Sequence, residues 1–196
     1  MSRFDNTSFK NPHFKDLAAF KDEYQRSISD SKYFLNKAKQ ELCWFHEPTR
    51  SNEGTFTSPR WFNDGKINIS YNCIDRHAEK TPNKTAIIWQ GDQQDQSEHI
   101  SYQILQEKVS KLANGLKEIG VAKGDRVCIY MPMIPEAAFA MFACMRIGAI
   151  HSVVFGGFSP EAIKSRILDS DCQFIVTTDE GTRGGRIIPL KSSVDI

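Results

Sequence analysis

The chain has 196 residues and a formal net charge of +1, from 25 basic and 24 acidic side chains. Hydrophobic residues make up 40% of it, which is enough for a buried core and excludes wholesale disorder. The near-neutral charge gives no support for binding nucleic acid or an acidic membrane surface through bulk electrostatics. A large multidomain enzyme does not fit in this length.

The N-terminus lacks the apolar core of a secretory signal. The longest strictly apolar run, residues 137–145, is too short to span a bilayer. We therefore expect a cytoplasmic protein with no membrane partner. The five cysteines include no C-x-x-C pair, so neither a disulfide framework nor a closed zinc site is indicated. Cys73 and His77 are four residues apart, but two ligands do not make a metal site.

The first third of the chain is rich in aromatic residues, with 12 of the 21 lying between Phe4 and Phe62. Two segments have helical patterns, roughly residues 15–26 and 30–42, and residues 43–66 carry too many turn formers for regular structure. We predict that residues 1–75 form an arm that packs onto a larger body through its aromatic rings. The alternative is a small helical subdomain.

From residue 84 onward, short apolar segments alternate with helical patterns. Within these segments, apolar residues follow one another without alternating with polar residues. This pattern is typical of parallel strands covered on both faces. Ser101 and Ser159 are expected N-caps and Gly148 an expected helix stop. The predicted fold class is α/β with parallel-type βαβ units. Its strands are residues 84–90, 126–131, 149–155 and 172–178, and its helices are 101–119, 135–147 and 160–169.

Two glycine-containing loops follow the third and fourth of these strands, where ligands bind in open parallel sheets. In the first, Gly156 and Gly157 leave room for a ligand beside Phe155, and the adjoining helix N-terminus favours a negative group. In the second, Arg183 and Arg186 flank Gly184 and Gly185, and two guanidinium groups suit phosphate oxygens.

Each loop also has a purely structural interpretation. Gly156 and Gly157 could form a tight turn between strand and helix. The two arginines could lie in a solvated loop and pair with Asp179 and Glu180. Neither loop matches a Walker or dinucleotide-binding motif, and no Ser/His/Asp constellation can be proposed from spacing.

Four blocks of the sequence resemble the acetyl-coenzyme A synthetases, which are AMP-forming acetate–CoA ligases of the adenylate-forming superfamily. The blocks are residues 61–89, 124–137, 146–162 and 177–191. The resemblance runs from about residue 20 to the last residue. It implies that residues 76–196 are the first, incomplete part of the large AMP-binding domain, preceded by the arm.

The resemblance implies a two-step reaction in which acetate and ATP give acetyl-adenylate, and CoA then releases acetyl-CoA and AMP. Magnesium accompanies ATP. The family's CoA-contacting elements match Arg183, Gly184, Gly185 and Arg186 in one loop and Phe155, Gly156 and Gly157 in the other. These seven residues are the predicted CoA-binding residues.

The family's phosphate loop, adenine and acetate pockets, hinge and catalytic lysine have no counterpart in this sequence. We therefore expect no catalytic residue, ATP site or metal site here, and expect that the isolated chain does not form adenylate. The missing C-terminal portion of the same enzyme is the expected partner. Two alternatives remain, a non-catalytic CoA- or nucleotide-binding module and a portion of a propionate or other short-chain acyl-CoA ligase.

Overall fold

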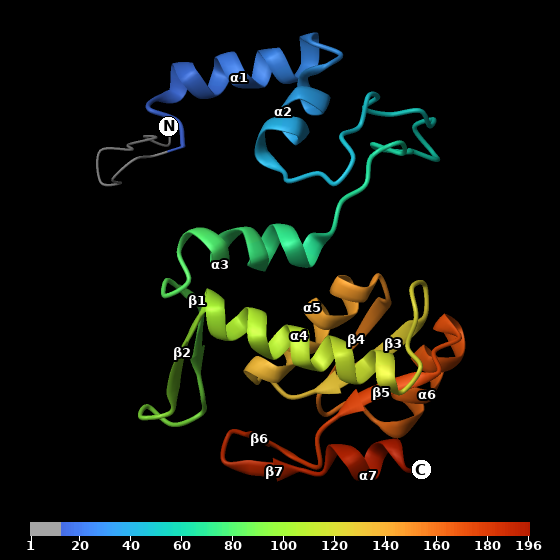
Figure 1. Ribbon diagram of the computed structural model, residues 1–196. Coiled ribbons are helices and arrows are strands. Elements are labelled where there is room, and N and C mark those ends of the chain that lie inside the picture. The colour runs from blue at the N-terminus through green and yellow to red at the C-terminus, as the bar shows by residue number, and fades with distance from the viewer. Residues whose placement is uncertain (1–12) are drawn as a thin grey trace. The chain divides into compact units, whose positions relative to one another are not determined.

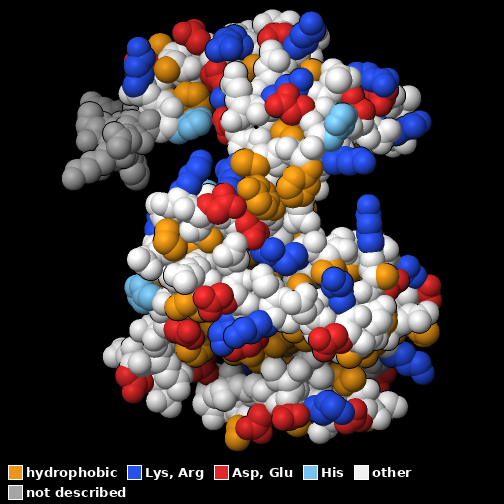
Figure 2. Space-filling view, viewed as in Figure 1, with side chains coloured by type: hydrophobic (Ala, Val, Ile, Leu, Met, Phe, Trp, Pro, Cys, Tyr) orange, Lys and Arg blue, Asp and Glu red, His pale blue; other side chains and the backbone are white. Residues whose placement is uncertain are grey.

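The computed structural model describes residues 13–196. Phe4 and Phe9, two aromatic residues of the predicted arm, therefore lie outside the described residues. The chain divides into two compact units (Figure 1). Unit 1 ends at Ile67, and unit 2 comprises Asn68–Ile196. On the face visible in Figure 2, basic and acidic side chains are interspersed over both units, as the balanced composition implies.

Unit 1 contains two helices, α1 (Leu17–Ser29) and α2 (Tyr33–Glu41), close to the segments predicted from the sequence. The Asp16 carboxylate caps α1 by accepting from the Ala19 amide at 2.8 Å. The Tyr33 hydroxyl donates to Glu23 at 2.7 Å, and this hydrogen bond lowers the pKa of the Glu23 carboxyl. Polar contacts between side chains therefore join the two helices.

The apolar side chains of α1 are largely exposed. Leu17, Phe20 and Tyr24 are each more than two-fifths exposed, and α1 has no buried residue. Residues 43–66 contain no helix or strand, as expected, and are held by isolated bridges such as the one between His46 and Lys66.

Unit 2 begins with a π-helical turn (Tyr71–Asp75) and α3 (Arg76–Lys80). Polar contacts from Asn68 and Asp75 join this start of the unit to helices further along the chain. The Asn68 amide donates to the carbonyls of Met145 and Arg146 at 3.2 and 3.1 Å. The Asp75 carboxylate accepts two hydrogen bonds from the Arg146 guanidinium, at 3.1 and 2.7 Å, and one from Gln106 at 2.8 Å. The bidentate pair holds the π-helical turn against the later helices of unit 2.

The main sheet of unit 2 has three parallel strands in the order β4 (Ile150–Phe155), β3 (Arg126–Met131), β5 (Phe174–Thr177). Helices α4 (Tyr102–Glu118) and α5 (Pro135–Ile147) supply the core on one face. Helices α6 (Pro160–Ser170) and α7 (Leu190–Val194) supply the core on the other. The predicted α/β class with parallel βαβ units is confirmed.

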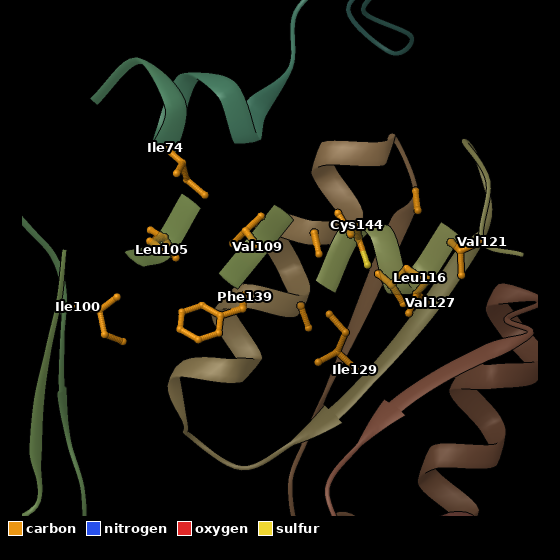
Figure 3. Packing of buried hydrophobic residues seen from close by; sticks show 14 residues of the cluster. Ile74, Ile100, Leu105, Val109, Leu116, Val121, Val127, Ile129, Phe139 and Cys144 are labelled. Atoms are coloured by element: carbon orange, nitrogen blue, oxygen red, sulfur yellow. The ribbon is translucent and has the colours of Figure 1, made fainter. Parts of the chain in front are cut away.

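The two cores meet at β3, whose side chains alternate between them. Val127 and Ile129 face Leu105, Val109 and Leu116 of α4 and Phe139 of α5, as Figure 3 shows. Cys128 and Tyr130 face the opposite core with Ile163 and Leu190. All four strand residues are at most 1% exposed, so β3 is the fully buried centre of the sheet.

The predicted helix ends are confirmed. The Ser101 and Ser159 hydroxyls each accept a hydrogen bond from an amide in the first turn of their helix, at 3.3 Å. Gly148 ends α5 in the left-handed conformation with φ +78°, which glycine adopts at little cost.

The strand predicted at residues 84–90 forms, but the prediction that it belongs to the parallel sheet was wrong. β1 (Thr85–Gln90) pairs antiparallel with β2 (Ser97–Ser101) in a separate two-stranded sheet. Residues 91–96 are the whole connection between them, which suits a hairpin, whereas a parallel crossover needs a dozen or more residues. The sequence analysis did not recognise β2.

β4 is an edge strand within residues 13–196, because no further described strand pairs with it. Ile150 and Val153 on this edge are 56% and 53% exposed. An apolar edge with unpaired backbone groups favours association between chains.

We predict that the chain self-associates in a concentration-dependent way and that Val153→Lys reduces this association, because a lysine on an edge strand opposes edge-to-edge pairing. Sedimentation velocity over a concentration series measures it. Leu168→Lys, which places the same charge at a 70% exposed site on α6, is the matched control and is expected to change little. A wild-type chain that stays monodisperse and monomeric throughout would contradict the prediction.

Candidate functional site

The two predicted loops lie at the same edge of the sheet in unit 2. Phe155 is the last residue of β4, and residues 156–158 lead from it to α6. The second loop is a β-hairpin of β6 (Gly181–Arg183) and β7 (Arg186–Ile188). Both follow the carboxyl ends of parallel strands.

Gly184 and Gly185 are the two turn residues of this hairpin, with φ of +57° and +73°. Positive φ at both central residues is the pattern of a type I′ turn, which explains the glycines at these two positions. Arg183 and Arg186 are directly opposite each other in the register, so their side chains leave the same face of the hairpin. Like charges in this arrangement repel each other, and an anion on that face would relieve the repulsion.

Arg183 connects the hairpin to the first loop. Its guanidinium carbon lies 4.9 Å from the centre of the Phe155 ring, within the range of a cation–π interaction. Phe155 also packs edge-on against Phe158, with ring centres 5.8 Å apart. Neither Arg183 nor Arg186 forms an ion pair within the part of the chain that the structure describes. The suggested pairing with Asp179 and Glu180 is therefore absent from it.

The two glycines of the first loop have different surroundings. A Cβ on Gly156 would lie 2.8 Å from the Met131 carbonyl oxygen and 3.1 Å from Leu190, so the protein itself fills this space. Gly157 has φ +117°, and a Cβ there would meet only Ile188, at 3.9 Å. Gly156 thus allows the loop to pack against β3, whereas Gly157 leaves an open approach to the backbone.

The N-terminus of α6 is already satisfied by the chain itself. The Ser159 hydroxyl accepts from the Ala162 amide, and the Glu161 carboxylate lies in the first turn. Hydrogen bonds from its own backbone and from Ser159 lower the pKa of Glu161. This helix end therefore offers a bound anion less than the sequence suggested, and the arginines of the hairpin carry the positive charge of the site.

Three residues that shape the site were not identified from the sequence: Tyr130, Leu190 and Arg166. Leu190 lies between the loops, because Cβ atoms on Gly156 and on Gly181 would meet its two methyl groups at 3.1 and 3.0 Å. The hairpin itself had a sequence signal, since two glycines between short apolar or β-prone segments indicate a turn of this kind.

One cavity of unit 2, about 580 Å³, is lined by the end of α4 with residues 120–123, Arg146 and Ile147, and none of the predicted site residues lines it. No helix in the described residues could cross a membrane, and residues 13–196 hold no group of three His, Cys, Asp or Glu side chains that could bind a metal ion.

Two sequence models of known families match this chain. Residues 74–194 match the sequence model of the AMP-binding enzymes. The chain belongs to this family. Residues 20–73 match the model described as the acetyl-coenzyme A synthetase N-terminus. The resemblance to acetyl-coenzyme A synthetases inferred from the sequence is confirmed.

Three bacterial relatives carry the printed name acetyl-coenzyme A synthetase. The protein of Gamma-proteobacterium EBAC31A08 is 55% identical over 186 residues, covering 94% of this chain and 29% of the relative. That of Halorhodospira halophila is 52% identical, covering 90% and 28%. That of Pseudoalteromonas translucida is 50% identical, covering 96% and 30%. The chain thus spans less than a third of the length of the curated relatives it matches.

We predict that Gly156→Ala destabilises unit 2 by about 1–3 kcal/mol, because the added methyl group meets backbone and a buried leucine that cannot easily move. Urea unfolding measures the change. Gly115→Ala is the matched control, since Gly115 lies in α4 with nothing within 4 Å of an added Cβ. There alanine should stabilise by up to about 1 kcal/mol. Equal effects of the two substitutions would contradict the packing described here.

Proposed function

We propose that the chain is the N-terminal portion of an acetate–CoA ligase, which makes acetyl-CoA from acetate, ATP and CoA through an acetyl-adenylate. The printed names of the relatives and the share of their length that is matched support this. We further propose that residues 1–75 are the N-terminal arm, that residues 76–196 are the first part of the AMP-binding domain, and that the protein is cytoplasmic.

Within that enzyme, this chain supplies residues that bind CoA. The observation that carries the proposal is the contact of Arg183 with Phe155, which joins the two predicted loops into one surface. CoA has a phosphorylated nucleotide end and a thin pantetheine arm. The guanidinium groups of Arg183 and Arg186 bind its phosphate oxygens, and the ring of Phe155 with the open backbone at Gly157 lies along the nucleotide.

The remaining chemistry belongs to the C-terminal portion of the enzyme. We propose that ATP, magnesium and acetate bind there, because the family's phosphate loop with its lysine has no counterpart in this sequence. We assign no catalytic residue to this chain. Its proposed role is to hold CoA by the end that does not react.

A second candidate function is a stand-alone CoA- or nucleotide-binding module. It is favoured by one observation, that both loops fold within this chain and contact each other without the rest of the enzyme. The two candidates differ in affinity. A portion of a larger pocket should bind CoA only weakly, with a dissociation constant of about 1 mM or above, whereas an independent module should bind in the micromolar range.

Ligand-observed NMR with CoA tests the proposed function. We predict weak, saturable binding that Arg183→Ala and Arg186→Ala each weaken about fivefold, since each removes one exposed charge-assisted contact. Dephospho-CoA, which lacks the 3′-phosphate, should also bind more weakly. Lys108→Ala removes the same charge from an exposed site on α4 and is the matched control.

The same preparation should show no acetate-dependent exchange of pyrophosphate into ATP. Robust exchange would contradict the placement of the adenylating machinery outside this chain. Binding of CoA that is indifferent to both arginine substitutions would contradict the proposed role of the hairpin. Micromolar binding that both substitutions weaken would favour the stand-alone module.

A further inference from the structure

Tyr130 is a large buried side chain that contacts the first loop of the candidate site. It lies near the carboxyl end of β3 with 0% of its surface exposed. Its hydroxyl accepts a hydrogen bond from the Gly157 amide at 3.2 Å and donates one to the Phe158 carbonyl at 3.0 Å. One phenolic oxygen therefore holds the backbone of two successive residues of the first loop.

The two hydrogen bonds complement each other. A hydroxyl can accept and donate at once, and here it satisfies one amide and one carbonyl that no helix or strand pairs. Gly157 sits at φ +117°, a conformation open to glycine but to few other residues, so the backbone there is free to move unless a contact restrains it. The hydroxyl of Tyr130 supplies that restraint from the buried central strand of the sheet.

The restraint extends from the loop backbone to its rings. Phe155 and Phe158 flank the two glycines and pack against each other. Arg183 of the hairpin lies over the Phe155 ring, and Arg166 of α6 lies over the Phe158 ring, each at 4.9 Å. Phe155 ends β4, and its ring is supported by Phe158, whose carbonyl Tyr130 holds. The position of Arg183 is thus set partly by a ring that the loop supports.

We propose that Tyr130 is a positioning residue of the CoA site, which acts through the first loop to hold Phe155 and, on it, the guanidinium of Arg183. The inference rests on the proposed function. Because Tyr130 is buried, it acts on the ligand only through other residues. It fixes the loop before the ligand arrives, so that less conformational entropy is lost on binding.

Tyr130→Phe removes only the hydroxyl and tests the inference. We expect hydrogen exchange at the Gly157 amide to accelerate about tenfold, because its acceptor is lost. The Arg183 side-chain NMR signals should move toward the positions of a free arginine as the contact with Phe155 loosens. The CoA concentration at half-saturation should rise about threefold, since the loop must then be ordered on binding.

Tyr102→Phe is the matched control. Tyr102 stacks on His77 through its ring, and that stack survives loss of the hydroxyl. It should leave the Gly157 exchange rate, the Arg183 signals and the CoA concentration at half-saturation unchanged. A Tyr130→Phe chain that keeps the wild-type Arg183 signals would overturn the inference, even if its stability fell, because Tyr130 would then serve the core alone.

The outcomes separate this inference from the proposed function. If the wild-type chain does not respond to CoA but the Arg183 signals still depend on Tyr130, the proposed function fails and the positioning role stands. If the Tyr130→Phe chain does not fold, the rate of hydrogen exchange at the Gly157 amide of the wild-type chain tests the inference instead. A protected Gly157 amide supports the hydrogen bond, and exchange at the rate of an unstructured loop overturns it.

Discussion

The pairing of β3 with β4 on one side and β5 on the other determines where every element of the candidate site emerges. Both pairings are parallel, so the segments after the three strands leave at one edge of the sheet. β3 contributes to both cores and is almost completely buried, which makes it the least mobile part of the sheet. The loops pack against Tyr130 and Met131 at its carboxyl end and against Pro132, which follows it.

Short-range packing then brings the loops together on that edge. Leu190 contacts the backbone at Gly156 and at Gly181, so one apolar side chain spaces the first loop from the hairpin. The arginines remain outside this packing, on one face of a hairpin whose turn glycines allow the sharp reversal. Their mutual repulsion is tolerated because Arg183 lies on the Phe155 ring and both are exposed. This is the surface that we propose binds a phosphorylated ligand.

Much of this could be predicted from the sequence, because the signals are local. Ser101, Gly148 and Ser159 mark helix ends through their own backbone chemistry, and 126–131 is read correctly as a buried strand. What failed depends on contacts distant in sequence. The antiparallel pairing of β1 with β2 and the hydrogen bonds from Tyr130 to a loop about 27 residues away leave no periodic trace. A tyrosine in an apolar strand looks the same in sequence whether its hydroxyl is used or not.

The most direct test of the central claim, that the two loops form one anion-binding surface, is a protein-observed NMR titration with 3′-phosphoadenosine 5′-diphosphate. The amides of Gly156 and Gly157 report on the first loop, and those of Gly184 and Gly185 report on the hairpin. If the loops form one site, all four signals move along a single saturation curve with one midpoint, and signals on α1 of unit 1 stay in place. Movement of the hairpin signals alone, or two different midpoints, would contradict the claim.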